Sequence, residues 1–283
     1  MCRYEAPTGW FGQRCPSCGR LFDCQRVGQL LESKLKTLAE LGQKKTTYYP
    51  TGNETFDFVV GGGLVKGSTI LFGGSRGAGK SSLLIDVANG MAKGDRKVLY
   101  ASGEESAEDV GKIAHRLGVL NENIEVMGNA NDIDDIIARA EELKPFLIII
   151  DSLQVMTVSD VKGTEGSVSQ GVAVANVITS HCKRTKQCGI VVNHMAKSGE
   201  FVGSSSVEHL VDTVLTLSQY FIDDDDDLDQ FPKRLRYSEH LRLLSVDKNR
   251  NGEEMRSGFF EMTDHGVVPV KKRSKLELVK DEE

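Results

Sequence analysis

Short apolar runs alternate with amphipathic stretches along most of this chain. Five near-continuous apolar runs predict buried strands at residues 68–73, 97–102, 124–128, 146–151 and 189–194. Between them, apolar residues recur at helical spacing and predict helices near 80–93, 106–117, 132–143 and 170–187. Apolar strands that are separated by helices form parallel sheets covered on both sides. The pattern therefore predicts an α/β fold with a mostly parallel, twisted sheet and helices on both faces.

Additional segments lie on both sides of this pattern. Three apolar runs with short connections, 212–218, 241–247 and 258–263, predict an antiparallel extension of the sheet. Residues 26–43 carry leucines at helical spacing, and the polar stretch 44–57 reads as an exposed linker. The predicted parts are a cysteine-rich segment at 1–25, a helix and linker at 26–49, an α/β domain at 50–270 and a charged tail at 271–283.

Composition narrows the class of protein. The 283 residues are 39% hydrophobic and 27% charged, which is typical of a soluble globular protein. No apolar stretch approaches the ~20 residues that a membrane helix needs, and the N-terminus has no signal-peptide pattern. We therefore expect a cytoplasmic protein with no membrane partner. The net charge of −6 excludes a generally basic coat, so a nucleic acid would have to meet a local patch or channel.

Four of the six cysteines cluster near the N-terminus. Cys15 and Cys18 form a C-x2-C knuckle, and Cys2 and Cys24 would complete a four-ligand site. Clustered cysteines in a reducing compartment favour Zn²⁺ over disulfides. Because the spacing is irregular for a zinc ribbon, a degenerate finger without metal and a redox pair stay open.

The stretch GGSRGAGKSSLL, residues 73–84, lies between the first predicted strand and helix. Gly74, Gly79, Lys80 and Ser81 match the phosphate-binding loop G-x-x-x-x-G-K-[ST]. In such a loop, backbone N–H groups bind the phosphates, the lysine reaches the β- and γ-phosphates, and the serine hydroxyl ligates Mg²⁺. A glycine-rich turn alone would indicate only a tight backbone, but the flanking strand and helix favour a nucleotide site. The residues predicted to surround the nucleotide are Gly74, Ser75, Arg76, Gly77, Ala78, Gly79, Lys80, Ser81 and Ser82.

Polar residues follow three other predicted strands. Asp151 ends the run FLIIID and favours a role in holding Mg²⁺ through water, with a capping role as the alternative. Glu104, and after it Glu105, is the candidate for orienting the attacking water, unless one of them only caps the next helix. Asn193 and His194 end GIVVNH, where a polar residue can sense the γ-phosphate, although a buried core histidine is nearly as good an interpretation.

Further segments suggest contacts with a long anion and with a neighbouring subunit. The polar loops 157–171 and 195–206 follow strands of the predicted site and are candidates for DNA contact, with ordinary surface loops as the alternative. Lys248 and Arg250 lie in the turn SVDKNRNGEEM, either as a solubilising tip or, in a ring-forming ATPase, reaching the adjacent subunit's γ-phosphate. The acidic run 222–230 reads as a solvated loop.

Together these segments resemble the bacterial RadA (Sms) family of RecA-like DNA repair ATPases. The resemblance covers almost the whole chain in the same order, and it rests on WFGQRCPSCG, TGNETFDFVVGGGLVKGS, GGSRGAGKSSLL, LYASGEES, LKPFLIIIDSLQ, HMAKSGEFVG and KNRNG. It implies an ATP- and Mg²⁺-dependent motor on single-stranded DNA that promotes branch migration of recombination intermediates. It also implies a homo-hexamer or nucleotide-dependent ring and a partner recombinase.

The resemblance also implies roles for particular residues. Lys80 and Ser81 would bind ATP, Asp151 the metal and Glu104 the water. Lys248 and Arg250 would couple neighbouring subunits.

Three features depart from the family. There is one C-x2-C pair where the family has two, and Asn251 stands where the family's KNRFG has phenylalanine. The sequence stops at residue 283 without the family's C-terminal Lon-protease-like domain, so we expect a short form with a less supported ring and no protease activity. An ATP-binding DNA-pairing or scaffold protein with negligible turnover, and a KaiC-like autokinase, are the alternative functions.

Overall fold

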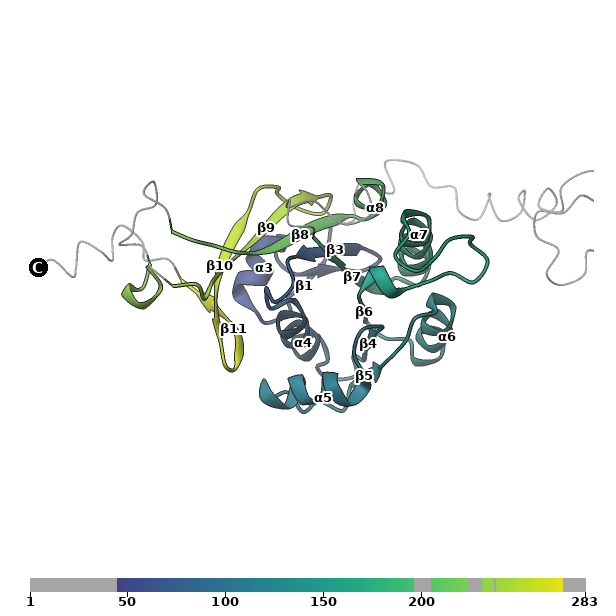
Figure 1. Cartoon of the computed structure of the whole chain (residues 1–283), viewed down its shortest axis with the longest axis horizontal. Coiled ribbons are helices and arrows are strands. Elements are labelled where there is room, and N and C mark those ends of the chain that lie inside the picture. The colour runs from purple at the N-terminus through teal and green to yellow at the C-terminus, as the bar shows by residue number, and fades with distance from the viewer. Residues whose placement is uncertain (1–44, 196–204, 223–230, 237, 272–283) are drawn as a thin grey trace, which may run out of the picture. The chain divides into compact units, whose positions relative to one another are not determined.

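A nine-stranded sheet organises the residues that the structure describes (Figure 1). The computed structural model describes residues 45–195, 205–222, 231–236 and 238–271. In space the strand order is β11–β10–β9–β8–β3–β7–β6–β4–β5. The strands are β3 (Thr69–Gly74), β4 (Val98–Ser102), β5 (Ile124–Met127), β6 (Leu147–Asp151), β7 (Cys188–His194), β8 (Thr213–Gln219), β9 (Leu241–Asn249), β10 (Ser257–Thr263) and β11 (Gly266–Val270).

The sheet divides into a parallel and an antiparallel part. The neighbours β8, β3, β7, β6, β4 and β5 are parallel, and β9, β10 and β11 continue the sheet in antiparallel order. The predicted fold class is therefore confirmed. The orientation expected for 212–218 was wrong, because β8 pairs in parallel with β3 after a connection that contains helix α8 (Ser205–Leu210). The sequence patterns also missed β11, which forms a hairpin with β10.

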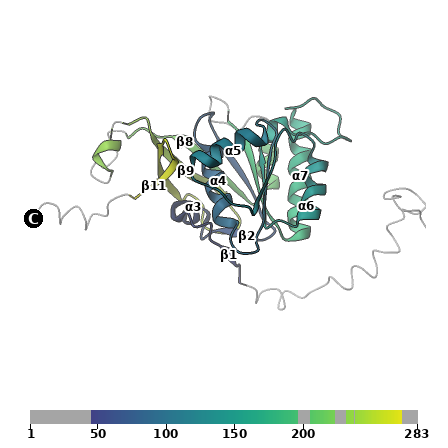
Figure 2. The same ribbon diagram turned by 90° about the horizontal axis from the view of Figure 1, so that it is seen from below.

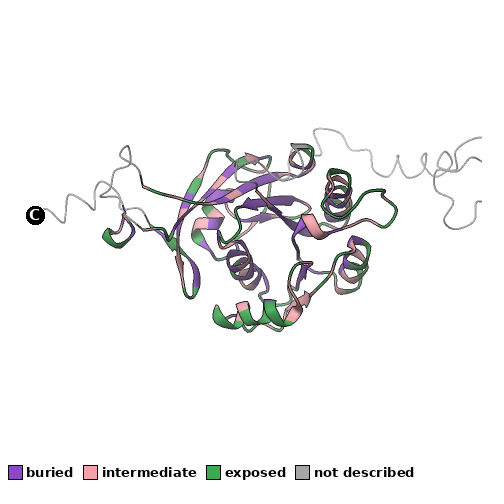
Figure 3. Cartoon of the chain, in the orientation of Figure 1, coloured by how far each residue is buried: buried purple, intermediate pink, exposed green. Residues whose placement is uncertain are grey.

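Helices cover both faces of the parallel strands (Figure 2). Helices α3 (Glu54–Val60), α4 (Lys80–Met91) and α5 (Ala107–Arg116) contribute to the same core cluster as Phe72. Helices α6 (Ile133–Leu143), α7 (Val168–Thr185) and α8 contribute to the cluster that contains Leu71. Because successive strand residues point to opposite faces, both sides of β3 are buried, as the colours of Figure 3 show for the central strands. No helix in the described residues has the length and apolar composition to cross a bilayer.

The polar stretch predicted as an exposed linker is instead packed in part. Tyr48–Tyr49 form strand β1, which pairs with β2 (Leu64–Val65). Thr51 is only 1% exposed, and its backbone N and hydroxyl both donate to Asp57 Oδ1 at 2.8 Å. Asn53 caps α3 by accepting from the Phe56 backbone N at 3.0 Å. The stretch reads as exposed because it is polar, but its polar groups satisfy one another inside the fold.

Helix α4 lies directly against this packed stretch. Asn53 Nδ2 donates to Asp86 Oδ2 on α4 at 2.9 Å. One turn further along α4, a Cβ atom added to Gly90 would lie 1.6 Å from the Thr51 carbonyl oxygen. Only glycine allows this close approach, so Gly90 ties the position of Thr51 to the helix that follows the phosphate-binding loop.

We expect Gly90→Ala to lower the free energy of unfolding by about 1–3 kcal/mol, because the added methyl group overpacks the contact with Thr51. The matched control is Gly111→Ala in α5, where no other atom lies within 4 Å of the added Cβ. That change should leave stability unaltered or raise it by up to ~1 kcal/mol, as alanine favours helix. Urea denaturation of both full-length variants measures the difference, and equal effects would contradict the packing of Thr51 on α4.

Candidate active site

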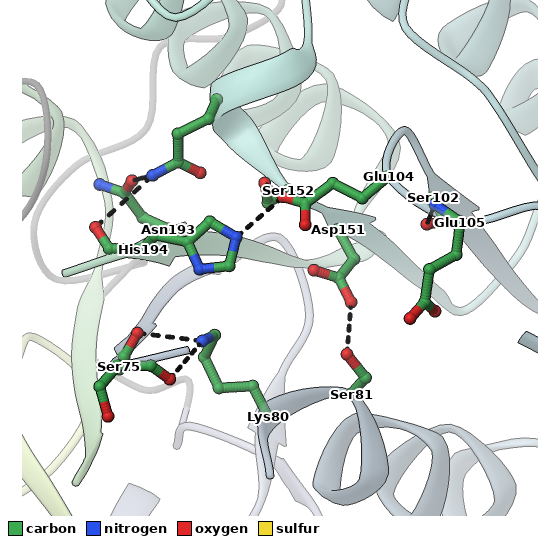
Figure 4. A network of polar contacts seen from close by, with 12 residues as sticks. Ser75, Lys80, Ser81, Ser102, Glu104, Glu105, Asp151, Ser152, Asn193 and His194 are labelled. Carbon is green, nitrogen blue, oxygen red and sulfur yellow. Dashed lines mark hydrogen bonds and ion pairs between the residues drawn. The ribbon is translucent and has the colours of Figure 1, made fainter. Parts of the chain in front are cut away.

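The carboxyl ends of four parallel strands meet at one edge of the sheet (Figure 4). The phosphate-binding loop follows β3, Glu104 and Glu105 follow β4, Asp151 ends β6 and His194 ends β7. Since the strands are neighbours in the order β3–β7–β6–β4, residues far apart in sequence converge here. The structure thus brings together the P-loop and the three acidic residues named from the sequence, with His194 beside them.

The phosphate-binding loop joins β3 to α4. Gly79 lies just before α4 with φ of 100°, a left-handed conformation that favours glycine. A Cβ at Gly79 would also approach Met262 Cε to 2.7 Å, so the loop lies against the β10–β11 hairpin. Ser75, Arg76 and Gly77 form an exposed tip, while Ala78 and Ser82 are buried.

Lys80 is the first residue of α4 and is buried in spite of its charge. Its Nζ donates to the carbonyl oxygens of Gly74 at 2.9 Å and Ser75 at 3.0 Å. Burial lowers the pKa of Lys80 below its ordinary value, although the negative charges of Asp151 and Glu104 oppose the shift. An ammonium group held by two carbonyls inside the loop is well placed to bind phosphate oxygens.

Asp151 is the acid at the centre of the site. It is 8% exposed, and its Oδ2 accepts from Ser81 Oγ at 3.0 Å and from the Tyr100 hydroxyl at 2.7 Å. Burial raises the pKa of Asp151 above its ordinary value, while these two hydrogen bonds favour the ionised form. Burial and the Asp151 carboxylate raise the pKa of Tyr100 well above its usual range, so Tyr100 acts as a donor.

Sequence reasoning missed Tyr100, which lies inside a buried strand. The available signal was that a buried tyrosine hydroxyl normally needs a hydrogen-bond partner. It also missed Ser152, which follows Asp151 and donates to Glu104 Oε1.

Glu104 and Glu105 have different environments in spite of being neighbours. Burial alone would raise the pKa of Glu104, but hydrogen bonds from Ser152 and His194 bring it below its ordinary value. The bond to His194 joins Nε2 to Oε1 at 2.8 Å. By contrast, burial and the charges of Asp151 and Glu104 raise the pKa of Glu105. Glu105 Oε2 is buried without a hydrogen-bond partner in the described residues.

The predicted DNA loops begin beside this cluster. Gln154 Nε2 donates to Asn193 Oδ1, which links the start of one loop to the end of β7. The base of the loop 157–171 is held by buried Gln170, whose side chain bonds the backbone of Val158 and Val161, both at 2.8 Å. Most of the second loop, 195–206, lies outside the described residues.

Lys248 and Arg250 lie away from the phosphate-binding loop of their own chain. Lys248 is opposite Val214 at the start of β8, whereas Gly74 pairs with Leu217, about 10 Å further along that strand. Lys248 Nζ donates to the carbonyls of Glu208 at 2.7 Å and Val211 at 2.9 Å. Both residues therefore contact the end of α8, where Arg250 donates to His209 O at 3.2 Å.

The predicted zinc ligands Cys2, Cys15, Cys18 and Cys24 lie outside the described residues, so zinc stays a prediction. Among the described residues, no group of three or more metal-ligating side chains was found that could hold a metal ion by itself. Cys182 and Cys188 are buried, and burial raises the pKa of each thiol to about 12, which makes them packing residues.

This fold, with a strand–loop–helix phosphate site and an acidic strand end beside it, defines a RecA-like P-loop NTPase core. The chain belongs to the family described as "AAA domain", which matches residues 52–200. It is similar to the DNA repair protein RadA of Haemophilus influenzae (35% identical over 252 residues), of Rickettsia bellii (34% over 281) and of Escherichia coli (35% over 251). The predicted resemblance to RadA is thus confirmed.

The alignments cover different shares of the two proteins. They include 89%, 94% and 89% of this chain, respectively, but 51%, 59% and 51% of the three relatives. The chain therefore spans about half the length of the curated relatives it matches.

We expect His194→Gln to raise the pKa of Glu104. Burial raises this pKa, and the variant removes the histidine contact that lowers it. Carbon-detected NMR titration of the glutamate carboxyl groups measures this directly. A carboxyl with a lowered pKa stabilises the folded state at neutral pH and loses that contribution as the pH falls through its folded pKa. The variant should therefore be less stable at pH 7 and lose less stability on acidification. The control is His115→Gln at an exposed position of α5, which should leave the Glu104 titration unchanged.

Proposed function

We propose that this chain binds ATP with Mg²⁺, hydrolyses it, and uses the cycle to act on DNA in repair or recombination. The observation that carries the proposal is the convergence of Lys80, Ser81 and Asp151 with a Glu104 carboxylate held by two side chains. The names of the RadA relatives support the link to DNA repair.

Lys80 and Ser81 would bind the nucleotide through the phosphate-binding loop. In this proposal Lys80 exchanges its carbonyl contacts for the β- and γ-phosphates. Bound Mg²⁺ would neutralise charge on the transferring phosphoryl group. The donor set fits the ion, since Ser81 and Asp151 offer the oxygen ligands that Mg²⁺ prefers. The buried, unpartnered Glu105 Oε2 adds negative charge that a cation would offset.

Glu104 would orient the attacking water. Its lowered pKa keeps it ionised at neutral pH, and the Ser152 and His194 contacts fix the position of Oε1. The water oxygen would bond to the γ-phosphorus as the bond to the β–γ bridging oxygen breaks and ADP leaves. Glu104 or the inorganic phosphate that forms would accept the water proton. His194 is a positioning residue in this scheme, and Glu105, whose Oε2 has no hydrogen-bond partner among the described residues, is the less firmly held carboxylate.

The same contacts would couple hydrolysis to DNA. His194 and Asn193 precede the loop 195–206, and Gln154 precedes the loop 157–171. A change in the Glu104–His194 contact on hydrolysis would therefore reach both loops through the Asn193–Gln154 hydrogen bond. Single-stranded DNA held by these loops would stimulate turnover, and movement of the loops would drive branch migration together with a recombinase.

A homo-hexameric or nucleotide-dependent ring fits the position of the Lys248–Arg250 turn. This turn lies away from its own phosphate-binding loop, so its cations would have to act on the nucleotide of a neighbouring chain. Lys248 is held by two backbone carbonyls. Arg250 pairs with Asp212 at 3.6 Å and donates to His209 O, but its side chain is 51% exposed. Arg250 is therefore the better candidate to reach a neighbour's γ-phosphate.

A steady-state phosphate-release assay with and without single-stranded DNA tests the proposed function. Glu104→Gln should reduce turnover by about 10²–10⁴-fold, the usual contribution of a general base, while ATP binding is retained. Lys80→Ala should abolish ATP binding. Glu108→Gln, the same charge change at an exposed position in α5, is the control and should keep wild-type turnover. A wild-type chain that binds ATP and assembles but shows no DNA-dependent turnover would instead support the scaffold function.

If Arg250 acts on the nucleotide of a neighbouring subunit, two inactive variants should complement each other in a mixture. Arg250→Ala chains keep the phosphate-binding loop and Lys80→Ala chains keep the arginine, so each alone should lose about 10³-fold or more of the turnover. Mixing the two variants should restore part of it. Arg234→Ala, which removes an exposed arginine paired with Glu261, is the control and should have no such effect. Failure of the mixture to exceed the sum of its components would contradict action between subunits.

A further inference from the structure

The edge of the sheet where the parallel strands begin contains a cavity of about 640 Å³. The lining residues come from the segments that precede β3, β7, β6 and β4, at the other end of these strands from the nucleotide site. They include six cations, which are Lys66, Arg96, Lys97, Lys144, Arg184 and Lys186. Asp95 and Glu141 are the two acids in the lining, so this cavity has an excess of four positive charges.

Most of this positive charge is not neutralised by the protein. Arg184 pairs with Glu141 at 2.8 Å. Lys66, Lys97, Lys144 and Lys186 are exposed and form no ion pair with any described residue. Such an accumulation is unexpected in a chain whose net charge is −6.

The dipoles of neighbouring helices balance only part of this excess positive charge. Helices α4, α6 and α7 end at this edge, and Lys144 and Lys186 directly follow the last two in left-handed conformations. Each helix C-terminus carries roughly half a negative charge, so three of them together offset about 1.5 positive charges. The excess of four charges in the lining is larger, and it leaves a net positive cavity.

The cations follow the strand order and form a row. Lys66 precedes β3, Lys186 precedes β7, Lys144 precedes β6 and Lys97 precedes β4, and these four strands are neighbours in that order. At about 4.8 Å per strand, the row extends for ~14 Å. One nucleic acid strand places a phosphate roughly every 3.4 Å along a duplex axis, so the row spans about four phosphate spacings. This spacing fits a linear polyanion better than a single small anion.

An aromatic ring fixes two of the cations. Lys66 Nζ and Arg96 Cζ each lie 5.4 Å from the centre of the Phe146 ring. Lys66 Nζ is also 5.3 Å from the Tyr49 ring, which packs edge-to-face on Phe146. Cation–π contacts of this kind hold positive groups without neutralising their charge.

We propose that this cavity binds the phosphate backbone of a nucleic acid strand, at a site separate from the nucleotide site and from the loops that follow the strands. The proposal does not depend on ATP hydrolysis. In a DNA-acting ATPase it would provide a second contact, so that one molecule could hold two segments of a branched substrate.

The test replaces Lys66, Lys144 and Lys186 with glutamine in one full-length variant. The control variant carries Lys112→Gln, Lys233→Gln and Lys271→Gln, the same charge change at exposed positions outside the cavity. Fluorescence anisotropy with a labelled oligothymidine, over a series of salt concentrations and without nucleotide, measures affinity. We expect the cavity variant to bind about 10-fold or more weakly. The slope of log K against log salt should fall by about 2, at ~0.7 for each phosphate that the variant no longer neutralises.

Equal affinities and equal salt slopes of the cavity and control variants would overturn the inference, and so would a wild-type chain that binds no oligonucleotide. If the cavity variant changes only self-association, measured by sedimentation velocity, then the cavity binds an acidic segment of a second copy, such as 222–230, and the nucleic acid site is wrong.

Phosphate release is measured in parallel. DNA binding through the cavity without turnover would contradict the ATPase function alone, whereas DNA-dependent turnover with unchanged affinity in the cavity variant would contradict this inference alone.

Discussion

The site depends on one buried carboxylate that receives two hydroxyl hydrogen bonds. Asp151 ends the buried strand β6, and it joins Ser81 on α4 to Tyr100 on β4. Burial raises the pKa of Asp151 above its ordinary value, whereas the two hydrogen bonds to the charged form oppose this shift. The same two bonds fix the start of α4 relative to the strand ends. This small network thus positions the acid and the phosphate-binding loop relative to each other, while Ser152 and His194 hold Glu104 beside them.

Much of the fold could be predicted from the sequence, because strands that are buried on both faces appear as continuous apolar runs. β3, β4, β6 and β7 are apolar on both sides, so continuous runs such as FLIIID were sufficient to identify them. The stretch from Tyr48 to Asp57 was misjudged for the opposite reason. Its polar groups bond to one another and to α4, a situation that polarity alone cannot distinguish from exposure to water. The direction of β8 depended on the crossover through α8, whose short helix has no strong periodic signal.

The site was predictable as a set of residue types, but its electrostatics were not. The motif identified Lys80 and Ser81, and the strand ends identified Asp151 and Glu104. Only the three-dimensional arrangement shows that His194 and Ser152 lower the pKa of Glu104 while burial raises that of Glu105. Two adjacent glutamates in the sequence thereby acquire different chemistry. The anchoring of Lys248 on the carbonyls at the end of α8 could not be predicted from the sequence either, because it depends on the register between β8 and β9.

The two edges of a parallel sheet covered by helices are electrostatically unequal. Helix N-termini meet at the edge where strands end, and helix C-termini meet where strands begin, so the backbone alone favours anions at the first edge and cations at the second. The nucleotide site lies at the edge that favours anions, where Gly79 and Lys80 begin α4. At the second edge the lysines exceed what the helix ends can balance, and Phe146 holds two of the cations in place. Charge beyond the requirement of the fold costs self-repulsion, which an anionic ligand bound along the row would relieve.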